Sequence, residues 1–183
     1  MNYCSHCRAS VSLQIPEGDH RPRYVCEECG MIHYSNPKVV TGCLIEHDDK
    51  ILLCKRDIEP RRGYWTLPAG FLENQETAAE GAIRETFEET RARVDIDQLF
   101  CFFDIPHISQ IYLIYLARLQ NTDFGPTPES SEVKLFAESE IPWDEIAFPV
   151  IINTLQHYYQ SKKAGASATV FGLIDKRSID TAE

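Results

Sequence analysis

A glutamate-rich segment in the middle of the chain, residues 70–92, constrains the fold more than any other stretch. Its sequence is GFLENQETAAEGAIRETFEETRA, and residues 77–92 contain no proline and a single glycine. Alanine, glutamate and arginine predominate there, and these residue types favour helices. The segment therefore predicts a helix over residues 77–92, with Gly70 in the turn that precedes it.

Three glutamates of this predicted helix, Glu85, Glu88 and Glu89, project from nearly one face, because residues three and four apart are neighbours on a helix. Like charges at this spacing repel each other. Mg²⁺ would remove the repulsion, since it prefers carboxylate oxygens and is often completed by substrate phosphates. Arg84 lies four residues before Glu88, where it can hold that carboxylate in place. A solvated acidic face is the alternative, but a glycine and a further glutamate at fixed distances upstream favour a metal site.

The pattern resembles the signature of the Nudix hydrolases, G-x5-E-x7-R-E-U-x-E-E-x-G-U, in which U is a bulky aliphatic residue. The chain keeps the first glycine and every charged position of that signature, namely Gly70, Glu76, Arg84, Glu85, Glu88 and Glu89. Thr86 and Ala92 stand where U is expected, and Arg91 replaces the late glycine. These departures concern packing and the helix end rather than metal binding. The resemblance implies an α/β fold, the Nudix-type α/β/α sandwich with a mixed sheet.

Four cysteines near the N-terminus form the second strong pattern. Cys4, Cys7, Cys26 and Cys29 have the spacing C-x2-C-x18-C-x2-C, which suits two knuckles that bind one tetrahedral Zn²⁺ through four thiolates. We interpret residues 1–36 as a zinc ribbon. Four protein ligands close such a site, so we expect the Zn²⁺ to be structural and to contribute to folding. A pair of redox dithiols is the alternative interpretation.

The remaining composition indicates a compact intracellular enzyme. A formal net charge of −10 over 183 residues argues against a general affinity for nucleic acid or anionic lipid. We find no run of apolar residues long enough to span a membrane and no secretory signal, so we expect a cytoplasmic protein with no membrane partner. Cys43, Cys54 and Cys101 lie in apolar surroundings and are expected to be buried, reduced thiols.

Alternating strands and helices follow the ribbon, and we assign residues 37–161 to the hydrolase domain. Short apolar runs predict strands at residues 39–46, 51–56, 98–104, 111–118 and 133–136. Residues 121–131 are rich in proline, serine, threonine and acidic residues and predict a loop, and residues 148–160 predict a closing helix. The tail at residues 162–183 has a weak pattern, apart from a candidate strand at residues 169–174.

The resemblance also implies roles for individual residues around the acidic helix. In the family a backbone carbonyl just before the first motif glycine commonly joins the metal shell, which corresponds to Ala69 here. With Glu85 and Glu89 it would hold one or more Mg²⁺ or Mn²⁺ ions, and Glu88 is a further ligand or a base. The general base is often a glutamate on a late loop, a position that Glu132 resembles, with Glu129 as the nearby competitor.

Residues near the segment that precedes the motif are candidates for contacts with the substrate. Arg56 and Arg62 are placed to contact substrate phosphates, although exposed loop charge is an equal alternative. Phe103 is one aromatic residue that could stack on a base, although core packing is the commoner fate of such a ring.

The choice of substrate depends on a longer resemblance, which covers residues 3 to about 159. This span is similar to plant-type zinc-ribbon Nudix enzymes that cleave FAD and ADP-ribose, and it implies a nucleoside diphosphate derivative as substrate, AMP as product and a homodimer as a candidate assembly. A zinc ribbon also precedes the catalytic domain in NADH pyrophosphatases, but their SQPWPFPxS-like stretch has no counterpart here. NADH cleavage and a non-catalytic, nucleotide-sensing module remain the alternative functions.

Overall fold

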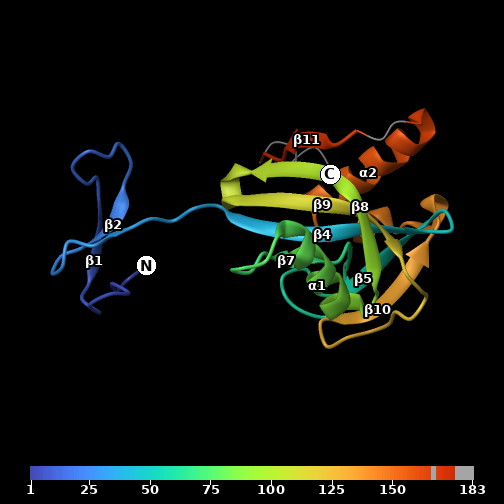
Figure 1. Ribbon diagram of the computed structural model, residues 1–183, viewed down its shortest axis with the longest axis horizontal. Coiled ribbons are helices and arrows are strands. Elements are labelled where there is room, and N and C mark those ends of the chain that lie inside the picture. Colours follow the sequence, from blue (N-terminus) through green and yellow to red (C-terminus); the bar gives the residue numbers. More distant parts are fainter. Residues whose placement is uncertain (166–167, 176–183) are drawn as a thin grey trace. The chain divides into compact units, whose positions relative to one another are not determined.

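The computed structural model describes residues 1–165 and 168–175. The chain divides into two compact units, Met1–Pro37 and Lys38–Glu183 (Figure 1). This division falls one residue after the boundary expected from the sequence. None of the helices in the described part of the chain is long and apolar enough to cross a bilayer.

The N-terminal unit is a small antiparallel sheet built around cysteines. Its three strands, in the order β1-β2-β3, are β1 (Val11–Gln14), β2 (Arg23–Cys26) and β3 (Ile32–His33). Cys4 and Cys26 are each 2% exposed, and no other hydrophobic residue of this unit is buried. A unit of this size cannot build a sufficient apolar core, so a bound metal is the expected source of its stability.

The second unit contains an eight-stranded mixed sheet. Six strands form its main path in the order β10-β5-β4-β9-β8-β11, while β6 pairs with β5 and β7 pairs with β4. The strands are β4 (Lys38–His47), β5 (Lys50–Arg56), β6 (Trp65–Thr66), β7 (Ala69–Phe71), β8 (Val94–Ile105), β9 (Gln110–Leu119), β10 (Ser130–Phe136) and β11 (Val170–Leu173). The β4–β9 and β8–β11 pairs are parallel, and the others are antiparallel.

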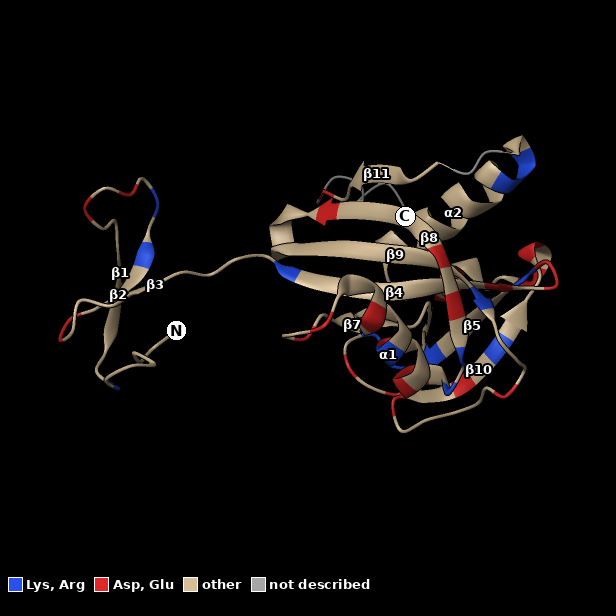
Figure 2. Cartoon of the chain, viewed as in Figure 1, with Lys and Arg blue, Asp and Glu red and all other residues tan. Residues whose placement is uncertain are grey.

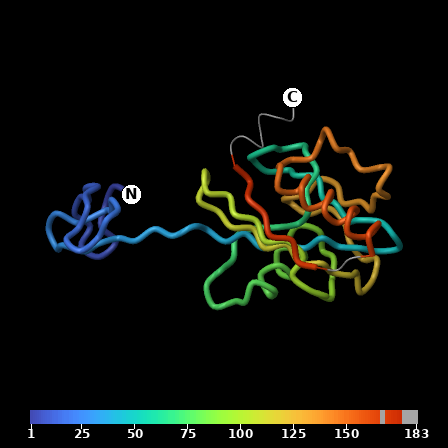
Figure 3. Tube along the Cα trace, turned by 90° about the horizontal axis from the view of Figure 1, so that it is seen from above, coloured from blue at the N-terminus to red at the C-terminus, as the bar shows by residue number. Residues whose placement is uncertain are grey.

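Helices α1 (Ala78–Thr90) and α2 (Pro149–Ala164) cover opposite faces of this sheet (Figure 3). Consecutive side chains of a strand point to opposite faces, and β4 shows the consequence. Leu44 packs in the apolar cluster that contains Leu155 of α2, whereas Cys43 and Ile45 pack in the cluster that contains Ala82 of α1. The expected α/β/α sandwich with a mixed sheet is therefore confirmed.

Helix α1 is defined at its N-terminus by a capping box. The Thr77 hydroxyl accepts a hydrogen bond from the Glu80 N–H at 3.2 Å, and the Glu80 carboxylate accepts one from the Thr77 N–H at 2.8 Å. The helix ends at Arg91, whose φ of 61° lies in the left-handed region that glycine adopts most readily. Arg91 is the residue that replaces the late motif glycine. Because Arg91 adopts the left-handed conformation, the helix still ends at this position.

Several local expectations differ from the structure. Strand β8 begins at Val94 rather than at residue 98, and the last two residues of the loop expected at 121–131 belong to β10. Gly70 lies in strand β7, opposite Thr41 of β4, rather than in a turn. Helix α2 continues to Ala164, four residues beyond the predicted end, and its C-cap Gly165 is left-handed with a φ of 62°. The candidate strand at residues 169–174 is present as β11 on the sheet edge, and residues 176–183 of the tail lie outside the described residues.

Candidate active site and zinc site

Arg84 of α1 organises the carboxylates around it. Its Nε and Nη2 donate to both oxygens of Glu76 at 3.0 and 2.8 Å, while Nη1 donates to Glu85 at 2.7 Å and to Glu88 at 3.0 Å. Nη2 also donates to the Phe71 carbonyl at 3.1 Å, which ties the helix to β7. The Arg84 hydrogen bonds lower the pKa of Glu76 to about 2. The motif arginine therefore holds three glutamates, Glu76, Glu85 and Glu88, together with strand β7.

The motif glycine is required by a close approach of Glu85. A Cβ atom on Gly70 would lie 2.2 Å from Glu85 Oε2, nearer than any real contact. Burial raises the pKa of Glu85, and the Arg84 hydrogen bond opposes this effect. The absence of a side chain at position 70 thus lets the Glu85 carboxylate lie directly against strand β7.

Glu89 is a buried carboxylate, only 5% exposed. Its Oε2 accepts a hydrogen bond from the Ala69 N–H at 3.0 Å and lies 3.8 Å from the Cys54 thiol. Burial raises the pKa of Glu89 to about 7, and the charges of Glu85 and Glu129 act in the same direction. In the described part of the chain the ion pairs of α1 involve its neighbours and not Glu89. A buried acid that forms no ion pair is suited to a bound cation.

The arrangement of these oxygens also limits what kind of cation site they form. Among the described residues, the four cysteines are the only group of three or more metal-binding side chains whose ligand atoms all lie within 4.8 Å of one another. The helix carboxylates are more spread out because Arg84 holds Glu85 and Glu88, while Glu89 turns toward Ala69. Mg²⁺ needs only one or two carboxylates when waters and substrate phosphates complete its shell. The donor set therefore fits a cation shared with a phosphate ligand.

Of the two predicted arginines, Arg56 lies nearer the acidic residues. Its charge lowers the pKa of Glu89, and its guanidinium carbon lies 5.2 Å from the centroid of the Phe148 ring. Arg62 instead forms an ion pair with Asp57 at 2.7 Å, and its side chain is 63% exposed. Figure 2 shows the acidic positions of α1 and the basic positions of β5 and β10 in the same unit.

Phe103 lies in the core rather than at the acidic residues. It is 2% exposed, and its ring lies 6.2 Å from that of His157 on α2. A Cβ atom on Gly172 of β11 would lie 2.5 Å from the Phe103 ring, so the strand covers it closely. Its expected role in stacking on a substrate base has no support from this position, because no face of the ring is free.

The two candidate bases have different surroundings. Glu132 forms ion pairs with Lys55 at 3.1 Å and with Lys134, and these two lysines lower its pKa, Lys134 most. The charge of Glu129 raises the pKa of both Glu85 and Glu89, which places it within electrostatic reach of the motif acids. The two candidates therefore differ in their partners: Glu132 is paired with two lysines, whereas Glu129 acts electrostatically on the acids of α1.

The four cysteines converge as their spacing predicts. The Cys4 and Cys29 sulfurs are 3.8 Å apart, and those of Cys7 and Cys26 are 3.3 Å apart. His33 Nε2 lies 3.3 Å from the Cys4 sulfur, close enough to donate a hydrogen bond to it. All four cysteines are free of disulfides, so four sulfur ligands are available for one Zn²⁺.

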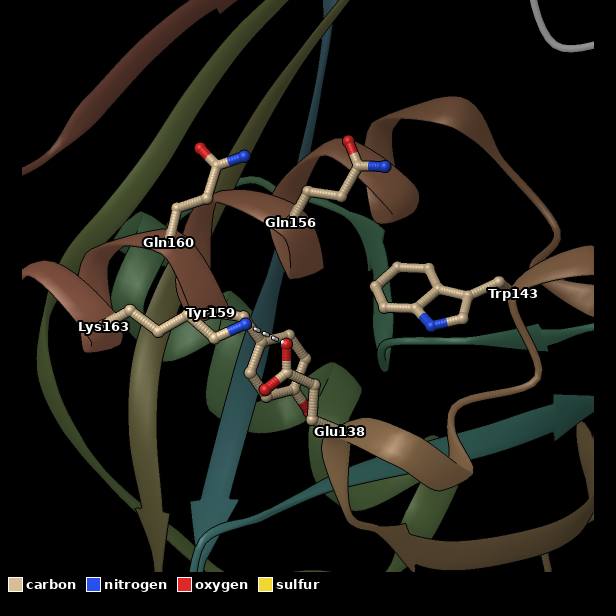
Figure 4. Close-up of a pocket in the computed structure, with 6 residues that line it drawn as sticks. All are labelled: Glu138, Trp143, Gln156, Tyr159, Gln160 and Lys163. Atoms are coloured by element: carbon tan, nitrogen blue, oxygen red, sulfur yellow. Dashed lines mark hydrogen bonds and ion pairs between the residues drawn. The ribbon is translucent and has the colours of Figure 1, made fainter.

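A separate hollow lies beside α2. Its lining comprises Glu138, Trp143, Gln156, Tyr159, Gln160 and Lys163 (Figure 4). Lys163 and Glu138 form an ion pair across it at 2.7 Å, and the buried Tyr159 hydroxyl has no hydrogen-bond partner among the residues that the structure describes. None of the motif residues lines this hollow, so it is distinct from the acidic site.

Several contacts of the acidic site had no signal in the sequence. Cys54 and Thr127 both touch Glu89, through its carboxylate and its backbone carbonyl respectively. Cys54 was expected only to be buried, and Thr127 lies in a segment that predicted a loop. Both contacts connect residues more than thirty positions apart, which no local pattern reveals.

Two family models match the chain. The model described as NUDIX domain matches residues 36–154, and the model described as Nudix N-terminal, a zinc ribbon, matches residues 2–35. The first match alone covers well over half of the chain. The two matches meet at the boundary between the two compact units within a few residues.

Individual relatives support the same assignment. A crystal structure of a NUDIX hydrolase from Nitrosomonas europaea has a TM-score of 0.93 and 53% identity, and the match covers 96% of this chain and all of that one. An ADP-ribose pyrophosphatase of Methanocaldococcus jannaschii is 30% identical over 115 residues, 60% of this chain and 67% of the relative. The NAD-capped RNA hydrolase NudC of Photobacterium profundum is 26% identical over 142 residues, and the match covers 77% of this chain and about half, 52%, of that protein. The chain therefore belongs to the Nudix family and is a Nudix pyrophosphohydrolase with an N-terminal zinc ribbon.

Proposed function

We propose that this protein hydrolyses the diphosphate linkage of a nucleoside diphosphate derivative, with ADP-ribose and FAD as the preferred substrates and AMP as a common product. The observation that carries the proposal is the buried Glu89 carboxylate, which forms no ion pair among the described residues and accepts a hydrogen bond from the Ala69 N–H, next to the motif glycine that Glu85 approaches. The similarity to an ADP-ribose pyrophosphatase supports the substrate class.

The acidic helix supplies the metal ligands in this proposal. Glu85 and Glu89, with the backbone carbonyl of Ala69, would hold Mg²⁺ or Mn²⁺, and Glu88 would serve as a further ligand. A bound divalent cation neutralises phosphate charge and lowers the pKa of coordinated water. Arg84 keeps the carboxylates of Glu85 and Glu88 in place through its hydrogen bonds.

Glu129 is the base that we propose, in place of Glu132. A general base must reach the attacking water and accept its proton. Glu129 is exposed on the loop before β10 and acts electrostatically on Glu85 and Glu89. Glu132 is engaged by Lys55 and Lys134, and these charges make it a poorer proton acceptor.

Arg56 is the proposed phosphate contact. Its charge already acts on Glu89, and a guanidinium can bind phosphate oxygens through two parallel hydrogen bonds. Phe148 lies against Arg56 and is only half-buried, so its ring is a better candidate for base stacking than Phe103. Arg62 is a weaker candidate because it is paired with Asp57.

A substrate panel tests the proposal. The full chain is incubated with Mg²⁺ and, separately, with ADP-ribose, FAD, NADH and nucleoside triphosphates, and released AMP is quantified by chromatography. We expect AMP from ADP-ribose or FAD at the highest kcat/KM, and no release when the divalent cation is omitted. Release from none of these compounds would favour a nucleotide-sensing module.

NADH cleavage is the second candidate, because the match to the NAD-capped RNA hydrolase extends over 77% of this chain. The panel separates the two candidates directly. Preferential cleavage of NADH over ADP-ribose and FAD would replace the proposed substrate, and an arm with NAD-capped RNA would show whether the chain accepts a capped transcript. A net charge of −10 leads us to expect no cleavage of that RNA.

A further inference from the structure

The loop that precedes β10 is fastened to the last turn of α1. The last carbonyls of a helix have no partner within the helix. Here the Gly125 N–H donates to the Thr90 carbonyl at 2.9 Å, and the Thr127 hydroxyl donates to the Glu89 carbonyl at 3.2 Å. Two of the free carbonyls of α1 are therefore satisfied by one loop, and one of them belongs to a proposed metal ligand.

The same hydroxyl also binds the backbone of Glu129. The Glu129 N–H donates to Thr127 Oγ1 at 3.2 Å, within a turn closed by a hydrogen bond from the Ser130 N–H to the Thr127 carbonyl. Pro128 at the second position suits such a turn. A threonine at the start of a turn is common. The Thr127 hydroxyl, however, makes two hydrogen bonds at once: it donates to the Glu89 carbonyl and accepts from the Glu129 N–H.

The two hydrogen bonds of Thr127 hold the backbones of two acidic residues, Glu89 and Glu129, close together. Like charges held close together repel each other. Glu129 is exposed and could relieve the repulsion by moving into solvent. Its backbone is held by Thr127 on one side and by a hydrogen bond from the Asp57 N–H to its carbonyl, at 2.8 Å, on the other.

We infer that Thr127 is a positioning residue that fixes Glu129 against the last turn of α1, so that the base and the metal ligands keep a constant separation. The inference rests on the proposed function, in which Glu129 accepts the proton of the attacking water. Thr127 itself has no contact with substrate in this account; it acts through the backbone of Glu129.

Two substitutions at this position separate the hydroxyl from the rest of the side chain. Thr127→Val keeps the shape and removes both hydrogen bonds, whereas Thr127→Ser keeps the hydroxyl. We expect Thr127→Val to lower kcat about tenfold with little change in KM, because small misplacements of a catalytic group are costly, and Thr127→Ser to stay within about twofold of the wild type. Full kcat in Thr127→Val would overturn the inference.

A matched control variant and a double-mutant cycle show whether Thr127 affects kcat through Glu129. Thr122 is exposed in the same segment, and its side chain makes no hydrogen bond in the described structure, so Thr122→Val should have wild-type kcat. In a Glu129→Gln background, assayed at a raised enzyme concentration, Thr127→Val should cause no further loss. An equal loss in both backgrounds would show that Thr127 acts through the helix instead, which contradicts the inference.

Amide hydrogen exchange tests the link without substrate. The Glu129 N–H should exchange faster in Thr127→Val than in the wild type and Thr127→Ser, at equal melting temperature. Unchanged exchange would refute the link, whatever the activity. Full turnover in Glu129→Gln would refute the proposed base and the inference together, whereas a wild-type chain that cleaves no substrate, with faster exchange in Thr127→Val, would refute the proposed function and leave the link standing.

Discussion

Gly70 and Glu85 lie so close together that a Cβ atom at position 70 would be 2.2 Å from the Glu85 carboxylate. Gly70→Ala must therefore displace Glu85 or the β7 backbone. We expect kcat/KM to fall about a hundredfold, because a proposed metal ligand leaves its position. Gly125→Ala is the matched control, since its Cβ would meet open space. Steady-state kinetics of both variants check the prediction, and equal activity of the two would contradict it.

The Arg84 guanidinium, with its several N–H donors, cannot be replaced by a single ammonium group. Lysine keeps the positive charge but cannot contact Glu76, Glu85 and Glu88 together. We expect Arg84→Lys to destabilise the fold by about 1–3 kcal/mol, since several charge-assisted hydrogen bonds are lost. Urea unfolding monitored by circular dichroism measures the change, with Arg62→Lys at an exposed ion pair as the control. An equal, small effect in both variants would mean that the Arg84 network contributes little.

Glu89 should make the stability of the protein fall with pH in the absence of Mg²⁺ and Mn²⁺. Burial raises its pKa from the ordinary 4.5 to about 7, so the native state holds this proton more tightly than the unfolded state. Stability from this group is therefore complete at low pH and is lost as the pH rises through about 7. In Glu89→Gln this loss should disappear, and the variant should melt above the wild type at pH 8.

Glu132→Gln is the control with the opposite sign for this pH series. Lys134 and Lys55 lower the pKa of Glu132, so its stabilising effect is present above its ordinary pKa and is lost in acid. Removing it should lower the melting temperature at neutral pH. Thermal melts at several pH values distinguish the two carboxylates, and parallel profiles for both variants would contradict the assigned surroundings.

The zinc ribbon should affect folding before it affects chemistry. Cys26 is 2% exposed and lies 3.3 Å from the sulfur of Cys7, so Cys26→Ser removes a ligand from a site that replaces an apolar core. We expect loss of bound zinc and a lower melting temperature, with unchanged kcat per folded molecule. Metal analysis measures the bound zinc, and calorimetry measures the melting temperature. A variant that keeps its zinc and melting temperature but loses turnover would show that the ribbon is not structural.

The elements with strong local patterns were predictable, and the contacts between distant segments were not. The capping residue Thr77 and the run of helix formers after it specify α1 locally, and the cysteine spacing specifies the four-sulfur cluster. The strand around Gly70 depends on pairing with β4, which lies almost thirty residues earlier.

The candidate site shows the same limit. The acids of α1 follow from their spacing on one helix, but the choice between Glu129 and Glu132 depends on which of them meets Lys55 across the pairing of β5 with β10. Phe103 is apolar in a strand, and only the docking of β11 and α2 shows that both sides of its ring are covered.

The most direct test of the account compares AMP release by the wild type and by Glu89→Gln across a Mg²⁺ titration with ADP-ribose and FAD. The account predicts saturable, Mg²⁺-dependent release by the wild type and at least about a hundredfold lower kcat for Glu89→Gln, with its fold intact by circular dichroism. Near-full turnover of Glu89→Gln, or release by the wild type that does not depend on a divalent cation, would contradict it.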